Sequence, residues 1–452
     1  MTELWQDIQD SDFEIEMLQC EQEGKDAAAV HSLLENRPKN LDTADGQRAA
    51  FDLLAAVRSL PIRPGYSYIE PDDLAAIRAA RASDKVGLPA CTLTETAMED
   101  SLLGGWLGRT CGCLLGKPVE GWHRSRLYGL LKETGNFPLR RYICASEIPQ
   151  EIAAKYHVTP EEFHGWQYFA DNLTDGALPD DDTNYMVTAL ELWERHGANF
   201  TMLDVTNFWQ EAIPMEKTYT AERATFRNLR QGLLPPTTAI TANPYREWIG
   251  AQIRADVWGY LCPGNPESAA EFAWRDAAVS HVKNGIYGEM WSAAMNSAAF
   301  VTSNITQIIM AGLAQIPVKS RLHDAIEDVL EWYELEVDVD TAVYRVHELW
   351  NEERAHDWCH TISNAMIVAI GLLWGAGDYE KSICIAVQAC FDTDCNGATV
   401  GSICGIIAGA SKLPPNWISV VKDTLHTEVK GYERVLLSEM ARKTQALQLR
   451  EL

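Results

Sequence analysis

Apolar residues recur at intervals of three and four along most of this chain, which is the period of an α-helix with one buried face. The clearest segments are TAMEDSLLGGWLGRTCGCLLG, YMVTALELWERHG, AEFAWRDAAVSHVKNG, SRLHDAIEDVLEWYEL and VKGYERVLLSEMARKTQALQ. Gly or Pro often follows them, as expected where helices end. Alternating β-branched stretches do not persist beyond a few residues. The sequence therefore predicts an all-α fold.

Residues 1–95 differ from the rest and are predicted to form an N-terminal helical extension or a small accessory domain. The amphipathic segments GQRAAFDLLAAVRSL and EPDDLAAIRAARA are separated there by PIRPGYSYIEP. Thr96 is then expected to begin a long helix, with Glu99 three residues later at the spacing of a capping box. Residues 96–452 form the predicted main domain, in which residues 122–180 are expected to supply loops and short helices over a site.

The charge balance narrows the range of partners. Lys plus Arg number 38 and Asp plus Glu number 64, which gives a net charge of −26. Such a surface repels phosphate backbones and anionic lipid, so neither nucleic acid nor a membrane is an expected partner. The acidic start MTELWQDIQDSDFEIEMLQCEQEGK does not resemble a signal peptide, and apolar runs such as AMIVAIGLLWGAG are shorter than a membrane span. The eleven cysteines lack metal-ligand spacing apart from the short CGC at 111–113, which favours free thiols in the cytoplasm.

Two segments carry glycine at every fourth position. These glycines are Gly104, Gly108, Gly112 and Gly116 in one segment and Gly397, Gly401, Gly405 and Gly409 in the other. A glycine costs about 1 kcal/mol of helix propensity relative to Ala, so a repeated stripe calls for a structural reason. Stripes of small residues let two helix backbones approach closely, and an antiparallel or steep crossing is predicted here. The alternative is two glycine-rich core helices without a special partner.

Aspartates precede two of the predicted helices. PDDDTNYMVTALELW contains Asp180, Asp181 and Asp182, and FDTDCNGATVG contains Asp392 and Asp394. Either motif alone has an ordinary explanation, because an Asp at a helix N-terminus caps the helix and interacts favourably with its dipole. Five aspartates in one cleft, however, would raise one another's pKa values unless cations neutralised them.

The ligand atoms that these two motifs offer are all oxygen, without His or paired thiolates. Such a set favours Mg²⁺, Mn²⁺ or Ca²⁺ over Zn²⁺ or Cu²⁺. Two divalent ions about 3.5 to 4 Å apart can clamp neighbouring oxygens and activate a water molecule. The sequence therefore predicts a metal centre where the two motifs meet.

Together with GRTCGCLLGKPVEG at 108–121, the aspartate motifs resemble those of the ADP-ribosylglycohydrolase family. This family includes the ADP-ribosylarginine and ADP-ribosylserine hydrolases and the dinitrogenase-reductase-activating glycohydrolase. The resemblance extends from about residue 98 to about residue 412. It implies a compact all-α catalytic domain with two Mg²⁺ or Mn²⁺ ions that hydrolyses the glycosidic bond at C1 of an ADP-ribosyl group. The implied partners are ADP-ribose and ADP-ribosylated proteins or small molecules.

On this resemblance, several residues receive roles. Asp181 and Asp182 match the aspartate pair of the family's first metal motif, and Asp392 and Asp394 match those of the second. Asp181 and Asp394 are also placed in the predicted catalytic group. Glu120 matches a glutamate linked to catalysis or gating and is the first choice for a general base.

The predicted substrate contacts follow from the same resemblance. Arg254 and His281 resemble positions that line the substrate cleft, and Asn396 lies beside the second metal motif. For His281, the role of an ordinary core histidine stays an alternative.

Three positions depart from the family's usual pattern. Asp180 stands where Thr or Ser is usual, Cys395 stands where Thr is usual, and Cys113 replaces an acidic residue. Asp180 and Cys395 are included among the predicted metal ligands, although a thiol is a poor ligand for a hard ion and water or Asn396 is an alternative there. These departures leave two other functions open: a non-catalytic metal- or ADP-ribose-binding protein of the same fold, and a hydrolase of a small N-riboside.

Overall fold

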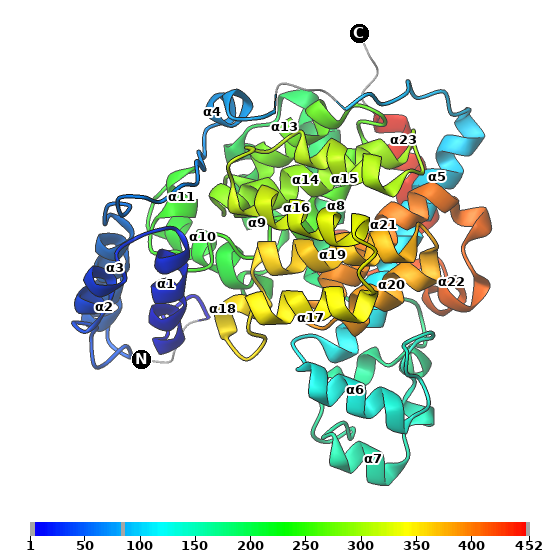
Figure 1. Cartoon of the computed structure of the whole chain (residues 1–452), viewed down its shortest axis with the longest axis horizontal. Helices are drawn as coiled ribbons and strands as arrows, with labels where there is room; N and C mark the ends of the chain where they lie inside the picture. The colour runs from blue at the N-terminus through cyan, green and yellow to red at the C-terminus, as the bar shows by residue number, and fades with distance from the viewer. Residues whose placement is uncertain (1–4, 83–85, 449–452) are drawn as a thin grey trace.

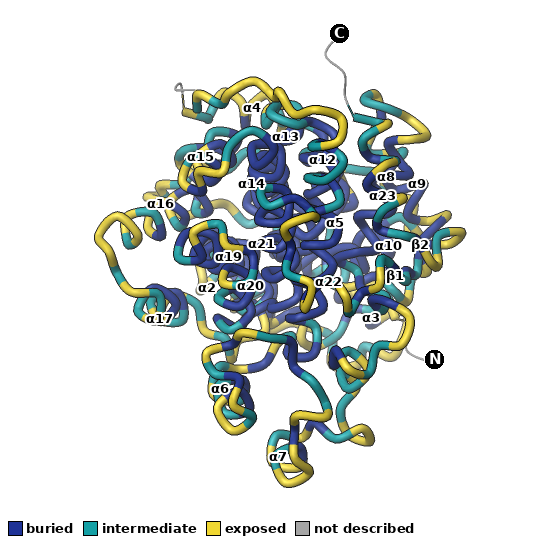
Figure 2. The backbone as a smooth tube through the Cα atoms, turned by 90° about the vertical axis from the view of Figure 1, so that its right-hand side faces the viewer, coloured by how far each residue is buried: buried dark blue, intermediate teal, exposed yellow. Residues whose placement is uncertain are grey.

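The computed structural model describes residues 5–82 and 86–448 of the chain. This part contains 23 α-helices and one ribbon of two short strands, so the predicted all-α fold is confirmed. Helices α5 (Glu95–Gly116), α14 (Lys283–Ala299) and α21 (Thr393–Ala408) run through the buried centre of the molecule (Figures 1 and 2). Among the described residues, no helix combines the length and the apolar character needed to cross a bilayer.

The other helices of the body surround these three. In chain order they are α6 (Arg124–Glu133), α7 (Gln150–Lys155), α8 (Asp181–His196), α9 (Met202–Ala212), α10 (Thr220–Arg230), α11 (Thr237–Ile240), α12 (Asp256–Tyr260), α13 (Pro266–Ala277), α15 (Ile305–Leu313), α16 (Arg321–Glu334), α17 (Val339–Leu349), α18 (Ala355–Trp358), α19 (Thr361–Gly375), α20 (Tyr379–Gln388), α22 (Pro415–Val421) and α23 (Leu437–Leu447). Strands β1 (Thr424–His426) and β2 (Arg434–Leu436) pair antiparallel, with Leu425 opposite Val435.

Helices α5 and α21 pack against each other along the two glycine stripes, in the close contact that the sequence predicts. The facing pairs are Gly104 with Gly405, Gly108 with Gly401 and Gly112 with Gly397. In each pair, a Cβ built on the first glycine would lie 2.0–2.2 Å from the carbonyl oxygen of the second. A side chain there would force the backbones apart. Because the pairs run in opposite chain order, the helices are antiparallel, and the end of α5 lies beside the start of α21.

The last glycine of the second stripe has a different role from the others. Gly409 follows α21 as its C-cap, with φ +76°, a backbone conformation that favours glycine. Gly409 therefore ends the helix rather than extending the contact surface.

The start of α5 differs from the prediction. Thr94 is the N-cap, and its Oγ1 accepts a hydrogen bond from the backbone N–H of Ala97 at 3.3 Å. With Thr94 as the cap, the third helical position is Ala97, whose side chain cannot complete a capping box. The predicted capping box of Thr96 and Glu99 is therefore wrong, because an earlier hydroxyl in TLTET begins the helix.

The N-terminal segment contains helices α1 (Asp10–Gln22), α2 (Ala27–Leu34), α3 (Ala44–Arg58) and α4 (Leu74–Ala79). The first three form a group beside α10, α11 and α18 at the left of Figure 1. They enclose a small hydrophobic cluster, which is separate from the main core and includes Phe13, Val30 and Leu54. The division of the chain near residue 95 stays a prediction.

Helix α1 is unusual because its buried side facing the body is polar. Glu16 and Glu23 each pair with Arg246 at 2.6 Å, and all three side chains are about fully buried. Gln19 contacts Nε2 of His356 through its amide oxygen at 3.2 Å. Buried charge pairs, rather than apolar contacts alone, therefore attach this helix to the body.

Residues 122–180 consist of loops and short helices, as predicted. They include α6, α7 and the short 3₁₀ helices His164–Tyr168 and Ala170–Asn172. In Figure 1, α6 and α7 project from the bottom of the molecule.

Candidate metal centre

Three helix ends meet where α5 and α21 cross. They are the C-terminus of α5 with the 3₁₀ turn Lys117–Val119, the N-terminus of α8 and the N-terminus of α21. The N-terminal ends of α8 and α21 carry partial positive charge, which favours carboxylates nearby. This crossing brings the two aspartate motifs together although 212 positions separate Asp180 from Asp392 in the sequence.

Capping explains one motif and not the other. Oδ1 of Asp180 accepts a hydrogen bond from the backbone N–H of Asp182 at 2.9 Å, so Asp180 caps α8. Asp392 occupies the N-cap position of α21 without making a capping hydrogen bond. Its side chain is therefore held for another reason.

Five buried side chains form two overlapping groups with the spacing of metal ligands. The first is Asp180, Asp182 and Asp394, and the second is Asp392, Asp394 and Cys395. Within each group, one ligand atom from every residue lies within 4.8 Å of the others. Asp181 stands beside them as the first residue of α8 and is partly buried.

Unpartnered oxygens show that a cation fits this cluster. Oδ1 of Asp392 and Oδ1 of Asp394 are buried and receive no hydrogen bond from an N–H, hydroxyl or thiol of the described residues. The two carboxyl groups lie within hydrogen-bonding range of each other, so either a shared proton or a cation would satisfy them. A buried carboxylate oxygen without a partner is costly, and a bound cation would remove that cost. Carboxylate oxygens are the ligands that Mg²⁺ and Mn²⁺ prefer.

The electrostatics of the cluster reflect crowded negative charge. Burial, together with Asp394 and Glu120, raises the pKa of Asp392 well above its usual value. Burial and Asp180 do the same to the pKa of Asp181. For Asp182, burial raises the pKa well above its usual value although Arg109 opposes the shift. The carboxylates therefore disfavour full ionisation in the absence of a cation.

Lys117 lies in the cluster and was missed by the sequence reasoning. Its Nζ is 2.7 Å from a carboxylate oxygen of Glu120, 2.7 Å from one of Asp180 and 2.9 Å from one of Asp394. Burial alone would lower the pKa of Lys117, but Asp180 and Asp394 outweigh it and raise this pKa well above the usual value. Lys117 also lowers the pKa of Asp394 against the effect of burial. The sequence contained one indication of this role, because Lys117 lies three residues before Glu120 in GKPVEG.

Arg109 is a second cation that the sequence reasoning missed. It is buried in α5, where its guanidinium pairs with Oδ1 of Asp182 at 3.1 Å and with Asp256 at 2.7 Å. It also donates to the backbone oxygen of Asp182 at 2.9 Å. Arg109 thereby fixes the start of α8 against α5.

Thiols contact two of the aspartates. Cys395 donates to Oδ2 of Asp182 at 3.1 Å, and Cys359 donates to Oδ2 of Asp392 at 3.3 Å. Cys113 is buried in α5, and burial together with Asp180 raises its pKa well above the usual value. Cys359 belongs to no motif, so nothing in the sequence pointed to it.

Glu120 lies at the edge of the cluster, directly after the 3₁₀ turn. Its side chain is 35% exposed and pairs with Lys117. Partial burial and repulsion by Asp394 raise the pKa of Glu120 to about 7. The group is therefore positioned between the buried aspartates and solvent.

Asn396 lies one residue beyond the second ligand group. Its Nδ2 donates to Oδ1 of Asn364 at 2.8 Å, and its own Oδ1 is buried without a partner among the described residues. Oδ1 of Asn364 also accepts from the backbone N–H of Asp392 at 3.1 Å. Asn364 thus holds the start of the second motif.

Among the described residues, the ion pairs and hydrogen bonds of Arg254 and His281 are with groups outside the aspartate cluster. Arg254 pairs with Glu222 and Asp276, and its guanidinium lies 4.7 Å from the ring centre of Trp209. His281 is buried, has Nδ1 2.8 Å from the Ser280 hydroxyl, and lines a separate cavity of about 340 Å³. Their predicted role as substrate contacts stays a prediction.

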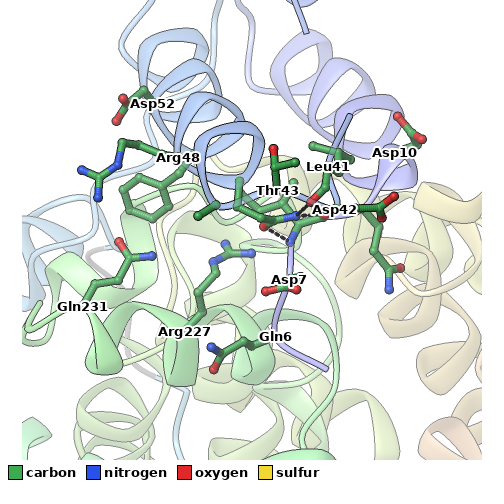
Figure 3. A pocket seen from close by; sticks show the side chains of 15 residues that line it. Gln6, Asp7, Asp10, Leu41, Asp42, Thr43, Arg48, Asp52, Arg227 and Gln231 are labelled. Atoms are coloured by element: carbon green, nitrogen blue, oxygen red, sulfur yellow. Dashed lines mark hydrogen bonds between the residues drawn. The ribbon is translucent and has the colours of Figure 1, made fainter. Parts of the chain in front are cut away.

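The molecule also contains a larger cavity, which lies away from the two aspartate motifs. It measures about 1020 Å³, and Arg48 of α3 and Arg227 of α10 are among its lining residues (Figure 3). None of the predicted site residues lines it. The chemistry of the side chains, and not cavity size, identifies the candidate site.

Comparison with known proteins identifies the family of the chain. A family model described as ADP-ribosylglycohydrolase matches residues 94–448. Among solved structures, the chain is similar to a protein described as "ADP-ribosylglycohydrolase-related protein complex", with a TM-score of 0.50, 18% identity, and coverage of 78% of this chain and 98% of that one. This likeness supports the fold. No curated protein matched the chain. Because the family model spans well over half of its length, the chain belongs to the ADP-ribosylglycohydrolase family.

Proposed function

We propose that this protein is a metal-dependent hydrolase that cleaves the glycosidic bond at C1 of an ADP-ribosyl group. Membership of the family supports glycohydrolase activity on ADP-ribose-like substrates. The observation that carries the proposal is the meeting of two distant aspartate motifs around buried carboxylate oxygens without donors.

The resident cofactor would be Mg²⁺ or Mn²⁺. The two overlapping ligand groups, which share Asp394, are the residues that would hold it. The resemblance implies two such ions, but the Lys117 ammonium lies within the first of the two ligand groups. A bound divalent cation supplies a binding point for ribose hydroxyls and lowers the pKa of a bound water.

Glu120 is the residue that we propose as general base. It belongs to neither ligand group, it is partly exposed, and it lies between the buried aspartates and solvent, where a carboxylate can take up a proton and release it. In the proposed reaction, Glu120 accepts a proton from the water that attacks C1. The bond from C1 to the leaving nitrogen or oxygen breaks, and the leaving group takes up a proton.

The aspartates would contribute beyond binding a cation. Glycoside cleavage passes through a transition state with positive charge on the sugar ring. Carboxylates held in a largely buried cluster stabilise such charge more strongly than they would in water. Asp181 lies at the start of α8 and is only partly buried, so we propose that it is the aspartate that contacts the substrate.

A turnover assay tests this function. ADP-ribosylated arginine and serine peptides and a small N-riboside are incubated with the full chain and Mg²⁺ or Mn²⁺, with and without EDTA. We expect hydrolysis of at least one substrate, loss of activity in EDTA, and recovery on adding metal. Asp394→Asn should lower turnover by at least about 100-fold, whereas Asp340→Asn, on the exposed surface of α17, should leave it unchanged.

The assay also separates the two alternatives. ADP-ribose binding without turnover of any substrate would indicate a non-catalytic binding protein. Turnover confined to the N-riboside would indicate a small-molecule hydrolase. Activity that persists unchanged in EDTA would overturn the proposed role of the metal.

A further inference from the structure

The Lys117 ammonium lies among carboxylates that include two members of the first ligand group. It lies 2.7–2.9 Å from carboxylate oxygens of three residues, Glu120, Asp180 and Asp394. These are the distances of charge-assisted hydrogen bonds. Two of the three, Asp180 and Asp394, belong to the first ligand group, whose third member is Asp182.

The position of Lys117 is fixed by the packing of its backbone. Lys117 directly follows α5, and its N–H bonds to the backbone oxygen of Cys113. The preceding residue, Gly116, accepts a hydrogen bond at 2.8 Å from the hydroxyl of Thr393, at the start of α21. A Cβ on Gly116 would lie 2.2 Å from the backbone of Thr393. The lysine therefore extends from a tight contact between two helices and is only 18% exposed.

An ammonium and a divalent ion would compete for this place. An ion bound to Asp180 and Asp394 would need oxygens at about 2.0–2.6 Å, inside the space that the ammonium fills. Two cations at such short range repel strongly in a buried setting. The first ligand group therefore already has its positive charge.

The second ligand group remains open. Asp394 is shared by both groups: its Oδ2 pairs with Lys117, while its Oδ1 has no donor among the described residues. Oδ1 of Asp392 lacks a donor as well. Both of these oxygens belong to the second group, with Cys395 as its third member. Oδ2 of Asp180, in the first group, also receives no hydrogen bond, but it lies 2.7 Å from the Lys117 ammonium.

From this arrangement we propose that the Lys117 ammonium replaces one cation of the binuclear centre, so that the chain binds a single divalent ion at Asp392 and Asp394. The inference rests on the proposed metal-dependent function. It makes Lys117 a positioning residue, which holds Glu120 and Asp394 without a second ion.

Counting bound Mn²⁺ tests the inference. The full chain is equilibrated by dialysis with excess Mn²⁺. The number of bound manganese ions per chain is then measured by inductively coupled plasma mass spectrometry. We expect one ion in the wild-type chain and two in Lys117→Met, in which a neutral side chain of similar length opens the first group. Lys412→Met, an exposed lysine near the other end of α21, is the control and should bind one ion.

Each outcome bears on the inference. Two ions in the wild-type chain would overturn it and leave the metal-dependent function intact. One ion in a folded Lys117→Met chain, as judged by circular dichroism, would also overturn it. Lys117→Gln serves as a second variant with the same expectation, and the wild-type count decides by itself if neither variant folds. No bound metal in any chain would overturn both this inference and the proposed function.

Discussion

Glu120 and Lys117 form a pair at the mouth of the acidic cluster, where a partly exposed carboxylate meets a mostly buried ammonium at 2.7 Å. Its exposure and its pairing with Lys117 distinguish Glu120 from the aspartates, which cap a helix or offer oxygens to a cation. A carboxylate in that position can accept a proton from water and release it to solvent. The role of Glu120 therefore differs from that of its neighbours in kind.

Glu120→Gln tests this role. The amide keeps the shape of the side chain and can still accept from Lys117, but it cannot take up a proton. We expect kcat to fall by at least about 100-fold while the affinities for Mn²⁺ and ADP-ribose stay unchanged. Steady-state kinetics and calorimetry measure the two quantities. A wild-type kcat in this variant would remove Glu120 from the mechanism.

Among individual residues, the sequence predicted those that belong to a recognisable motif. The aspartates were recognised because two similar patterns precede two helices, and the structure places Asp182 and Asp394 in one ligand group. Lys117, Arg109 and Cys359 were not predicted. A lone cation or thiol has many ordinary explanations. Only the fold shows that Arg109, Lys117 and Cys359 contact three aspartates of one cluster, which are Asp182, Asp394 and Asp392 respectively.

The contact between α5 and α21 is the element that assembles the centre. Facing glycines let the two backbones touch, and the antiparallel order places Glu120 and Asp394 at the same end of the pair. The four-residue period of glycine was visible in the sequence, whereas the start of α5 at Thr94 was not, because several hydroxyls compete for the cap. A periodic pattern over many residues is a stronger signal than a single cap.

Gly108→Ala tests this contact. The added methyl would lie 2.2 Å from the carbonyl oxygen of Gly401, so we expect a loss of stability of about 1 to 3 kcal/mol and weaker Mn²⁺ binding. Gly87→Ala is the control, since a Cβ there meets no atom within 4 Å. Urea unfolding and calorimetry provide the readouts. If Gly108→Ala were more stable than wild type, as helix propensity alone predicts, the account of close packing would be wrong.

Across the whole molecule, buried ion pairs connect the N-terminal segment to the body. Arg246 pairs with Glu16 of α1 and with Glu23, the C-cap of that helix, and Arg223 pairs with Asp12 at 3.4 Å. Removing one partner of a buried pair leaves an uncompensated charge. This organisation could not be predicted from the sequence, because the acidic start of the chain has the composition of a solvated surface.

Two substitutions on α1 test the attachment. Glu16→Gln removes a buried charge opposite Arg246 and should lower the free energy of unfolding by about 3 kcal/mol. Glu14→Gln, on the exposed side of the same helix, should change it by less than about 0.5 kcal/mol. Urea unfolding of the full chain measures both. Equal stability of the two variants would show that the buried pair does not hold the segment in place.

The central claim is that a catalytic divalent cation binds at Asp392 and Asp394, where the two aspartate motifs meet. A crystal structure of the full chain grown with excess Mn²⁺ and ADP-ribose, with anomalous scattering recorded for manganese, tests it most directly. We expect a manganese peak bound by Asp392 and Asp394, with a ribose hydroxyl of ADP-ribose beside it and Glu120 facing C1. ADP-ribose bound elsewhere, or no manganese at Asp392 and Asp394, would contradict the account.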